Sequence, residues 1–211
     1  MKNFNPLLYV ITDSEEFTEE EFLRRVEEAL IGGATLMQLR EKNRTGLEYY
    51  ELAKKVHAIT QKYNVPLIID DRLDVALAAG CEGVHLGQSD LPVDAARKIA
   101  GDDFIIGATA KTVEQAQSAY RMGADYLGSG AVYPTTTHVI TRITPVETID
   151  EICRAVPIPV NAIGGLTKDN IDVLKGVDIK GVCVVSAVMK AENPREATKE
   201  LLEATKELIN G

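Results

Sequence analysis

Short apolar runs alternate with amphipathic segments along the whole chain of 211 residues, and this alternation limits the possible folds. Apolar runs of about four to eight residues are typical of buried strands, and apolar positions at i, i+3 and i+4 are typical of helices. The rule gives these strands: Leu7–Thr12, Thr35–Arg40, Pro66–Asp70, Gly83–Gly87, Phe104–Thr109, Tyr126–Gly130, Pro159–Ile163 and Gly181–Val185. It gives these helices: Thr18–Ile31, Gly46–Tyr63, Leu73–Ala79, Pro92–Ile99, Val113–Met122, Val146–Ala155, Lys168–Leu174 and Pro194–Ile209.

Residues at the helix ends support this division. Glycines follow four of the helix candidates, where a left-handed C-cap is expected: Gly32-Gly33, Gly80, Gly123 and Gly176. Thr18 precedes Glu21 by three residues, and Thr112 precedes Gln115 by three, which are capping-box patterns at helix starts. The sequence therefore predicts eight strands, each followed by its own helix.

Eight such units predict an α/β protein with a closed parallel sheet, a single (β/α)8 TIM barrel that spans residues 1–211 as one domain. A doubly wound open sheet is the alternative, but eight regular units in this length favour closure. The length alone would also allow two small domains. Reacting groups of such barrels lie at the carboxyl ends of the strands. The longest irregular stretch, Tyr133–Pro145, is long enough to predict a functional loop.

The charge and the apolar content exclude several classes of partner. A net charge of −9 argues against general binding of nucleic acid or of an anionic membrane. No apolar run approaches the roughly 20 residues that span a bilayer, and the polar start Met1–Pro6 does not resemble a secretory signal. We expect a cytoplasmic protein that acts on small molecules. The sequence is compatible with a homo-oligomer and does not fix the oligomeric state.

The three cysteines are too few and too far apart for a disulfide framework or a zinc knuckle. Cys183 lies in an apolar run and is expected in the core, Cys153 lies on a helix pattern and Cys81 at a turn. None has a neighbouring motif that would activate a thiolate. The sequence therefore predicts no catalytic thiol.

Cationic and amide side chains follow the second strand. Alternation along an extended strand places Gln38, Arg40 and Lys42 on one side, toward the predicted barrel mouth. One amide and two cations suit an anionic ligand. The alternative is a solvated strand end at which Arg40 pairs with Glu41.

Carboxylates follow the third and fourth strands. Asp71 and Asp90 lie at neighbouring strand ends and could share one Mg²⁺, which prefers one or two carboxylates together with water and phosphate oxygens. The alternative is that each aspartate caps the helix that follows it. His85 lies in the middle of a strand between apolar neighbours, which favours a hydrogen-bonded barrel residue over a metal ligand.

Three later strand ends suggest phosphate contacts. Thr135, Thr137 and His138 offer hydroxyls and an imidazole on the long loop, although a Thr-rich surface turn is the alternative. Gly164-Gly165 follows the seventh strand and Val185-Ser186 ends the eighth. The loops after these two strands commonly hold a phosphate in this fold.

Together these motifs resemble the thiamine phosphate synthase family over nearly the whole chain. The stretches that carry the resemblance are Tyr9-Val10-Ile11-Thr12-Asp13, Gln38-Leu39-Arg40-Glu41-Lys42, Asp71-Arg72, Gly83-Val84-His85-Leu86-Gly87-Gln88, Asp90, Pro134-Thr135 with Thr137, Ile163-Gly164-Gly165 and Val185-Ser186. Several motifs in one order at similar spacing are more specific than any single one.

The resemblance implies a role for each matching position. Those implied to contact the pyrophosphate of hydroxymethylpyrimidine pyrophosphate are Gln38, Arg40 and Lys42. Asp71 and Asp90 resemble the Mg²⁺ ligands, and Thr109 stands where the family typically carries a serine that contacts the leaving group. Thr135 and Thr137 match loop threonines that contact the thiazole phosphate and the pyrophosphate. Gly165, Val185 and Ser186 match the positions that bind the thiazole phosphate.

Two positions depart from the family pattern. Asp70 stands where the family usually has Asn, so that a carboxylate replaces an amide that donates to pyrophosphate. His138 stands where the family usually has Lys, and Arg142 lies close enough in sequence to compensate for the lost charge. We include Asp70 and His138 among the expected substrate-binding residues.

The implied reaction is a substitution at the pyrimidine methylene with pyrophosphate as the leaving group. The electron-rich aminopyrimidine favours a dissociative path, which needs charge stabilisation and exclusion of water but no protein nucleophile. Arg40, Lys42 and Thr109 are the expected catalytic residues, with Mg²⁺ on the two aspartates. Closure of the long loop over the substrates would exclude water.

The sequence leaves three alternatives open. A thiazole tautomerase of the same fold would need no metal, but it is expected to carry His directly after Gly130, where this chain has Ala131. A non-catalytic barrel that binds thiamine precursors is suggested by Asp70 and His138, both of which disfavour departure of pyrophosphate. An unrelated phosphate-binding isomerase would need a central base, for which no candidate is left.

Overall fold

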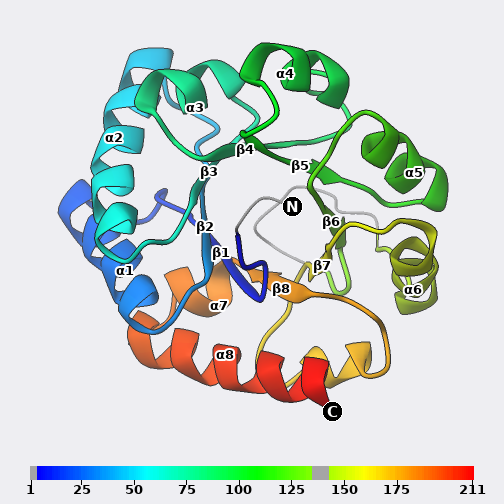
Figure 1. The fold of residues 1–211 in the computed structure, drawn as a ribbon. Coiled ribbons are helices and arrows are strands. Elements are labelled where there is room, and N and C mark those ends of the chain that lie inside the picture. Colours follow the sequence, from blue (N-terminus) through cyan, green and yellow to red (C-terminus); the bar gives the residue numbers. More distant parts are fainter. Residues whose placement is uncertain (1–3, 135–142) are drawn as a thin grey trace.

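Residues 4–134 and 143–211 are described by a computed structural model, in which eight parallel strands close into a barrel. Each strand pairs with the next along the chain, and β1 pairs with β8 to complete the ring. The helices surround the strands as an outer layer (Figure 1). The predicted (β/α)8 barrel is therefore confirmed, and the open sheet is excluded.

The strands fall within about one residue of the predicted limits. They are β1 Leu8–Ile11, β2 Leu36–Leu39, β3 Leu67–Asp70, β4 Gly83–Leu86, β5 Ile105–Thr109, β6 Tyr126–Gly130, β7 Val160–Ile163 and β8 Gly181–Val184. The α-helices are α1 Glu19–Ile31, α2 Gly46–Lys62, α3 Leu73–Ala79, α4 Val93–Ala100, α5 Val113–Arg121, α6 Val146–Ala155, α7 Ser186–Met189 and α8 Pro194–Asn210.

The seventh unit differs from its prediction. A helix was expected over Lys168–Leu174, but the structure has only a 3-10 turn, Ile171–Leu174. The Asn170 side chain explains the difference: its Oδ1 accepts from Thr167 N at 2.8 Å and its Nδ2 donates to Gly165 O at 2.9 Å. These bonds close a local turn over residues 165–170, and such side-chain-to-backbone bonds of Asn compete with the formation of a regular helix.

The helix ends follow the predicted chemistry. Thr18 Oγ1 accepts from Glu21 N, and Thr112 Oγ1 accepts from Gln115 N, each at 3.3 Å. Four of the glycines named for C-caps have positive φ: Gly33, Gly80, Gly123 and Gly176. Gly32 is the exception and keeps a right-handed conformation, with Gly33 making the left-handed turn.

Two hydrophobic layers hold the barrel together. The larger lies between the strands and the surrounding helices. The smaller fills the barrel interior with inward-facing side chains of alternate strand positions: Tyr9, Ile11, Leu36, Ile68, Ile105, Tyr126 and Cys183. Cys183 is 2% exposed, which confirms the prediction that it belongs to the core. All three cysteines are buried and free of disulfide bonds.

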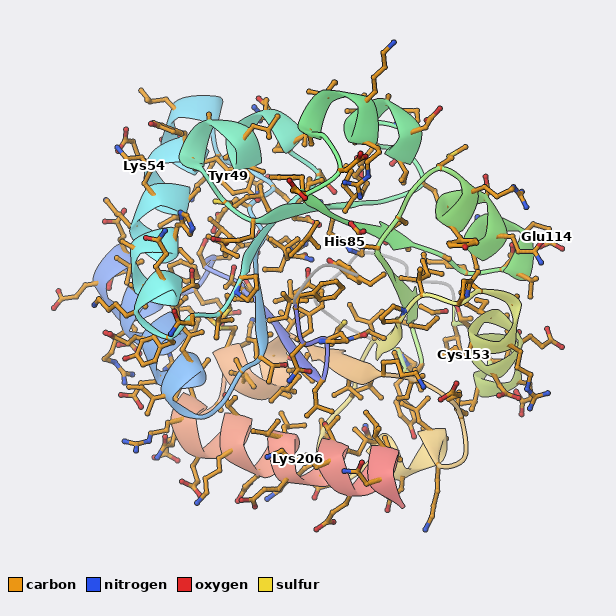
Figure 2. The ribbon with its side chains drawn as sticks, viewed as in Figure 1. Tyr49, Lys54, His85, Glu114, Cys153 and Lys206 are labelled. Carbon is orange, nitrogen blue, oxygen red and sulfur yellow. The ribbon has the colours of Figure 1, made fainter. Side chains whose placement is uncertain are left out.

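Within residues 4–134 and 143–211, none of the helices has the length and apolarity needed to cross a bilayer. Figure 2 shows Lys54, Glu114 and Lys206 on the outer helices.

Gly107 makes room for the Tyr126 ring inside the barrel, and its replacement gives the first prediction. A Cβ at position 107 would lie 2.1 Å from Tyr126 Cζ, so the ring or the strand must move. We expect Gly107→Ala to lower the free energy of unfolding by about 1–3 kcal/mol, the usual cost of overpacking, as measured by urea denaturation. Gly46→Ala, in the first turn of α2, is the control and should be neutral or stabilising. Equal stability of Gly107→Ala and the parent protein would contradict this description of the interior.

Candidate active site

A cavity of about 320 Å³ opens at the carboxyl ends of the strands, and all eight strands contribute to its wall. This is the end of the barrel at which active sites of the fold lie. Ten of the predicted site residues line it: Gln38, Arg40, Lys42, Asp70, Asp71, Asp90, Thr109, Gly165, Val185 and Ser186. Thr135, Thr137 and His138 lie outside the residues that the structure describes.

The two cations from the end of β2 face carboxylates from the end of β3. Lys42 Nζ lies 2.8 Å from Asp70 Oδ2 and also forms an ion pair with Asp71. Arg40 Nε lies 3.8 Å from the same Asp70 oxygen. Glu41, the alternative partner for Arg40, accepts hydrogen bonds from other side chains, among them Arg44 Nε at 2.9 Å. Asp70 therefore lies between the two cations that the sequence predicts as pyrophosphate ligands.

Burial and charge act in opposite directions on this cluster. Burial raises the pKa of Asp70, the neighbouring Asp71 carboxylate raises it further, and Lys42 opposes both. Partial burial lowers the pKa of Lys42, but the carboxylates of Asp70 and Asp71 outweigh it, so the net shift is upward. Lys42 is thus held in its charged form at neutral pH, as an anion-binding residue requires.

Asp71 and Asp90 bring two carboxylates together at the mouth. Asp71 has φ of +60°, a left-handed conformation that non-glycine residues adopt at an energetic cost. Asp90 Oδ2 accepts from Gly87 N at 2.7 Å. Burial raises the pKa of Asp90, and a side-chain hydrogen bond with Asp71 raises it further. The two side chains are therefore close enough to share a proton or a cation.

The capping alternative for these aspartates is wrong. The residue before α3 is Arg72 and the residue before α4 is Pro92, and neither helix start has a side-chain cap. In the described part of the chain, no group of three or more His, Cys, Asp and Glu side chains could enclose a metal ion. Two carboxylates open to the cavity do fit Mg²⁺, which takes its remaining ligands from water and substrate phosphate.

A chain of hydrogen bonds crosses the barrel beneath the cavity. Gln38 Nε2 donates to Tyr9 Oη at 2.6 Å, and the hydroxyls of Tyr9 and Tyr126 lie 2.8 Å apart. Tyr126 Oη lies 3.1 Å from His85 Nδ1, and His85 Nε2 lies 3.0 Å from Thr109 Oγ1. This confirms His85 as a hydrogen-bonded barrel residue, and Figure 2 shows its side chain on the inner side of the strands. Burial lowers the pKa of His85 to about 4, so the ring is neutral at pH 7.

Tyr9 and Tyr126 were not predicted as site residues. Tyr9 lies within a motif of the family, and Tyr126 begins β6, but both also read as ordinary apolar strand positions. Strand alternation places both tyrosines on inward-facing positions. Because a buried tyrosine hydroxyl usually needs a hydrogen-bond partner, this placement was the available signal for a polar network in the barrel. Both side chains are almost fully buried, at 1% and 0% exposure.

The glycine pair after β7 is required by its surroundings. Gly164 and Gly165 have φ of +107° and +64°. A Cβ at Gly164 would lie 2.4 Å from Ala131 Cβ, and one at Gly165 would lie 2.8 Å from Tyr133 Cβ. The backbone can therefore pass close to the end of β6 only without side chains. Both glycines line the cavity on the side of Ser186.

The sequence of the chain is similar to one protein family over most of its length. A family model described as thiamine monophosphate synthase matches residues 8–188. Thiamine-phosphate synthase 2 of Streptococcus pneumoniae serotype 4 is 50% identical over 96% of this chain and 97% of its own length. Thiamine-phosphate synthase of Methanobrevibacter smithii is 48% identical over 98% of each protein.

Solved structures agree with these sequence matches. Thiamine phosphate pyrophosphorylase from Pyrococcus furiosus superimposes with a TM-score of 0.88 at 43% identity, covering 96% of each chain. KGPDC from Streptococcus mutans superimposes with a TM-score of 0.71 at 15% identity, covering 97% of this chain and 99% of its own. The second likeness shows the barrel fold alone.

Proposed function

Since the chain belongs to the thiamine monophosphate synthase family and is a transferase that forms thiamine phosphate, we propose that its substrates are hydroxymethylpyrimidine pyrophosphate and hydroxyethylthiazole phosphate. Pyrophosphate is the leaving group, and the reaction depends on Mg²⁺. One observation carries the proposal: a single cavity gathers Arg40 and Lys42 beside the facing carboxylates of Asp71 and Asp90.

Arg40 and Lys42 bind the pyrophosphate oxygens and stabilise the charge that develops as the group departs. Both side chains emerge from the end of β2 into the cavity, where they lie against the Oδ2 oxygen of Asp70. The Thr109 hydroxyl, at the end of β5, adds a hydrogen bond to the same leaving group. Gln38 holds the pyrimidine substrate from the neighbouring wall of the cavity.

Asp71 and Asp90 would hold the Mg²⁺ ion. Two facing carboxylates, one of them with a raised pKa, form a site that gains from a divalent cation. When bound, the ion neutralises negative charge on the pyrophosphate and so makes it a better leaving group. The Gly87 N–H bond to Asp90 Oδ2 fixes one of the two carboxylates for this role.

Gly165, Val185 and Ser186 bind the thiazole phosphate on the opposite wall of the cavity. The fold supports this assignment, because loops after the seventh and eighth strands commonly bind phosphate in such barrels. Thr135, Thr137 and His138 belong to the proposed substrate contacts by resemblance to the family.

The reaction needs no nucleophile from the protein. Cys183 is the only thiol on the cavity wall among the described residues, and burial raises its pKa, which keeps it protonated. The charged residues at the mouth instead support a dissociative departure of pyrophosphate, after which the thiazole nitrogen attacks the pyrimidine methylene carbon. The cytoplasmic location stays a prediction, and the sequence leaves the oligomeric state open.

The carboxylate of Asp70 gives a prediction for substrate affinity. Asp70 holds Lys42 at 2.8 Å and places negative charge near the proposed pyrophosphate. We expect Asp70→Asn to lower the KM for the pyrimidine pyrophosphate about fivefold, equivalent to about 1 kcal/mol, in steady-state kinetics at fixed Mg²⁺. Asp74→Asn, at an exposed carboxylate paired with Arg72, is the control and should leave KM unchanged. A higher KM in Asp70→Asn would mean that this carboxylate helps to bind substrate or metal.

The proposed function is tested by mixing both substrates with the purified protein and measuring thiamine phosphate and pyrophosphate. We expect both products in equal amounts with Mg²⁺ and neither with excess EDTA. A tautomerase would act on its thiazole substrate with chelator present, although Ala131 provides no imidazole for it. A binding protein would retain the pyrimidine pyrophosphate without forming either product, and that result would refute the proposal.

A further inference from the structure

The hydrogen-bonded chain beneath the cavity joins two residues that face the substrates, Gln38 and Thr109, through three that do not have an assigned role. Gln38 comes from β2, Tyr9 from β1, Tyr126 from β6, His85 from β4 and Thr109 from β5. The four contacts are between 2.6 and 3.1 Å, so each link is a full hydrogen bond.

Glycines on neighbouring strands leave room for this hydrogen-bonded chain inside the barrel. His85 and Tyr126 lie on strands that are not neighbours, because β5 runs between them. Gly107 on β5 is the register partner of both, and its lack of a side chain lets the two rings meet. Gly128 on β6 likewise leaves space for the imidazole, since a Cβ there would lie 3.3 Å from His85 Cε1.

The protons of this hydrogen-bonded chain can be donated in either of two directions, from Gln38 toward Thr109 or from Thr109 toward Gln38. The nitrogen of Gln38 donates to the Tyr9 hydroxyl, and among the described contacts Tyr126 Oη is the acceptor available to the Tyr9 proton. Tyr126 then donates to His85 Nδ1, which leaves the ring proton of a neutral imidazole on Nε2. His85 Nε2 consequently donates to Thr109 Oγ1.

The direction decides what each end offers to a ligand. When Thr109 accepts from His85, its own proton is free to point into the cavity and donate to an anionic oxygen. In the reverse direction, the Thr109 hydroxyl would donate its proton to the imidazole, and Gln38 would turn its amide nitrogen toward the ligand. The first direction matches a cavity whose other wall carries Arg40 and Lys42.

We propose that Tyr126 and His85 are positioning residues that fix the direction of this hydrogen-bonded chain, so that the Thr109 hydroxyl donates to the substrate, and Gln38 presents its carbonyl oxygen to a donor on the pyrimidine and not to the pyrophosphate. Neither residue needs to touch the leaving group. The inference rests on the proposed function for the identity of the substrate, but the direction of the chain can be measured without any substrate.

The first test is the tautomer of His85 in the ligand-free protein. Long-range ¹H–¹⁵N correlation spectra of the histidine rings distinguish a proton on Nε2 from one on Nδ1. Signals of the three histidines are assigned with His57→Gln and His138→Gln variants. We expect His85 in the Nε2–H form, and we expect Tyr126→Phe to convert it to a mixture because the donor to Nδ1 is lost. An Nδ1–H ring in the parent protein would overturn the proposal.

The second test is a double-mutant cycle of Tyr126→Phe and Thr109→Val, measured by kcat and KM. Thr109→Val should lower kcat about tenfold or more, the size of a hydrogen bond to a charged group. Tyr126→Phe alone should lower kcat about three- to tenfold, and it should have no further effect when Thr109 is already Val. Independent effects of the two changes would overturn the proposal even if the synthase reaction itself is observed.

Controls separate positioning from damage to the fold. Tyr63→Phe removes a hydroxyl that bonds Glu27 on the outer helices, 3.1 Å away, and should leave kcat unchanged. Thermal unfolding of every variant shows whether a loss of kcat follows a loss of stability. If the parent protein forms no thiamine phosphate, the proposed function fails, and the cycle is repeated on the equilibrium binding of inorganic pyrophosphate with Mg²⁺. Coupled effects on binding then support the positioning role, and additive effects overturn it.

Discussion

Asp90→Asn is expected to lower kcat by about a hundredfold or more at a fixed Mg²⁺ concentration, because it removes one of the two proposed anionic metal ligands. Asparagine has the same shape, and its carbonyl oxygen can still accept the Gly87 N–H bond that now reaches Asp90 at 2.7 Å. The local structure should therefore survive. The rate measured against Mg²⁺ concentration should show activation shifted to much higher concentrations.

The control for Asp90→Asn is Asp178→Asn. Asp178 lies before β8, away from the cavity, and its exposed carboxylate pairs with Lys180. This variant should keep the Mg²⁺ dependence of the parent protein. If Asp90→Asn also kept it, Asp90 would not be a metal ligand, and the pairing of Asp71 with Asp90 would have to be explained as structural.

Arg40→Ala is expected to lower turnover at least tenfold. The guanidinium at the end of β2 is proposed to stabilise charge on the departing pyrophosphate, and losing one such contact costs on the order of 3 kcal/mol in the barrier, up to about a hundredfold in rate. Because the charge grows during departure, the loss should be in kcat as well as in kcat/KM. Steady-state rates with each substrate varied in turn distinguish these constants.

The matched control for Arg40→Ala is Arg154→Ala on α6. Arg154 is 75% exposed and pairs with Asp150 on the same helix, far from the cavity lining. Its removal should leave both constants unchanged. Normal turnover in Arg40→Ala would exclude this side chain from leaving-group stabilisation, whatever its effect on substrate affinity.

Local patterns were sufficient to predict most of the fold. The apolar runs of the strands and the glycines after the helices depend on residues close together in the chain, and those predictions are confirmed. The prediction of the seventh helix was wrong because the Asn170 side chain bonds the backbone of Gly165 and Thr167 and closes a local turn there. The short helix Ser186–Met189 was not predicted, since four residues give no measurable periodicity.

The site was predictable as a set of residues but not as a network. Strand alternation and family resemblance brought Arg40, Lys42 and Asp71 to the same mouth, where the structure places them. The contact of Lys42 with Asp70 and the meeting of His85 with Tyr126 join residues on different strands. Such contacts depend on the register around the closed barrel, which no local pattern encodes.

The proposed reaction requires a metal ion and a pyrophosphate to meet at one rim of the barrel, and a crystal soaked with Mn²⁺ and inorganic pyrophosphate tests this most directly. Manganese replaces magnesium at oxygen sites and is located by its anomalous scattering. We predict one strong peak in contact with carboxylate oxygens of Asp71 and Asp90, with pyrophosphate beside it and within reach of Arg40. A peak elsewhere, or a rim without metal and pyrophosphate, would contradict the account.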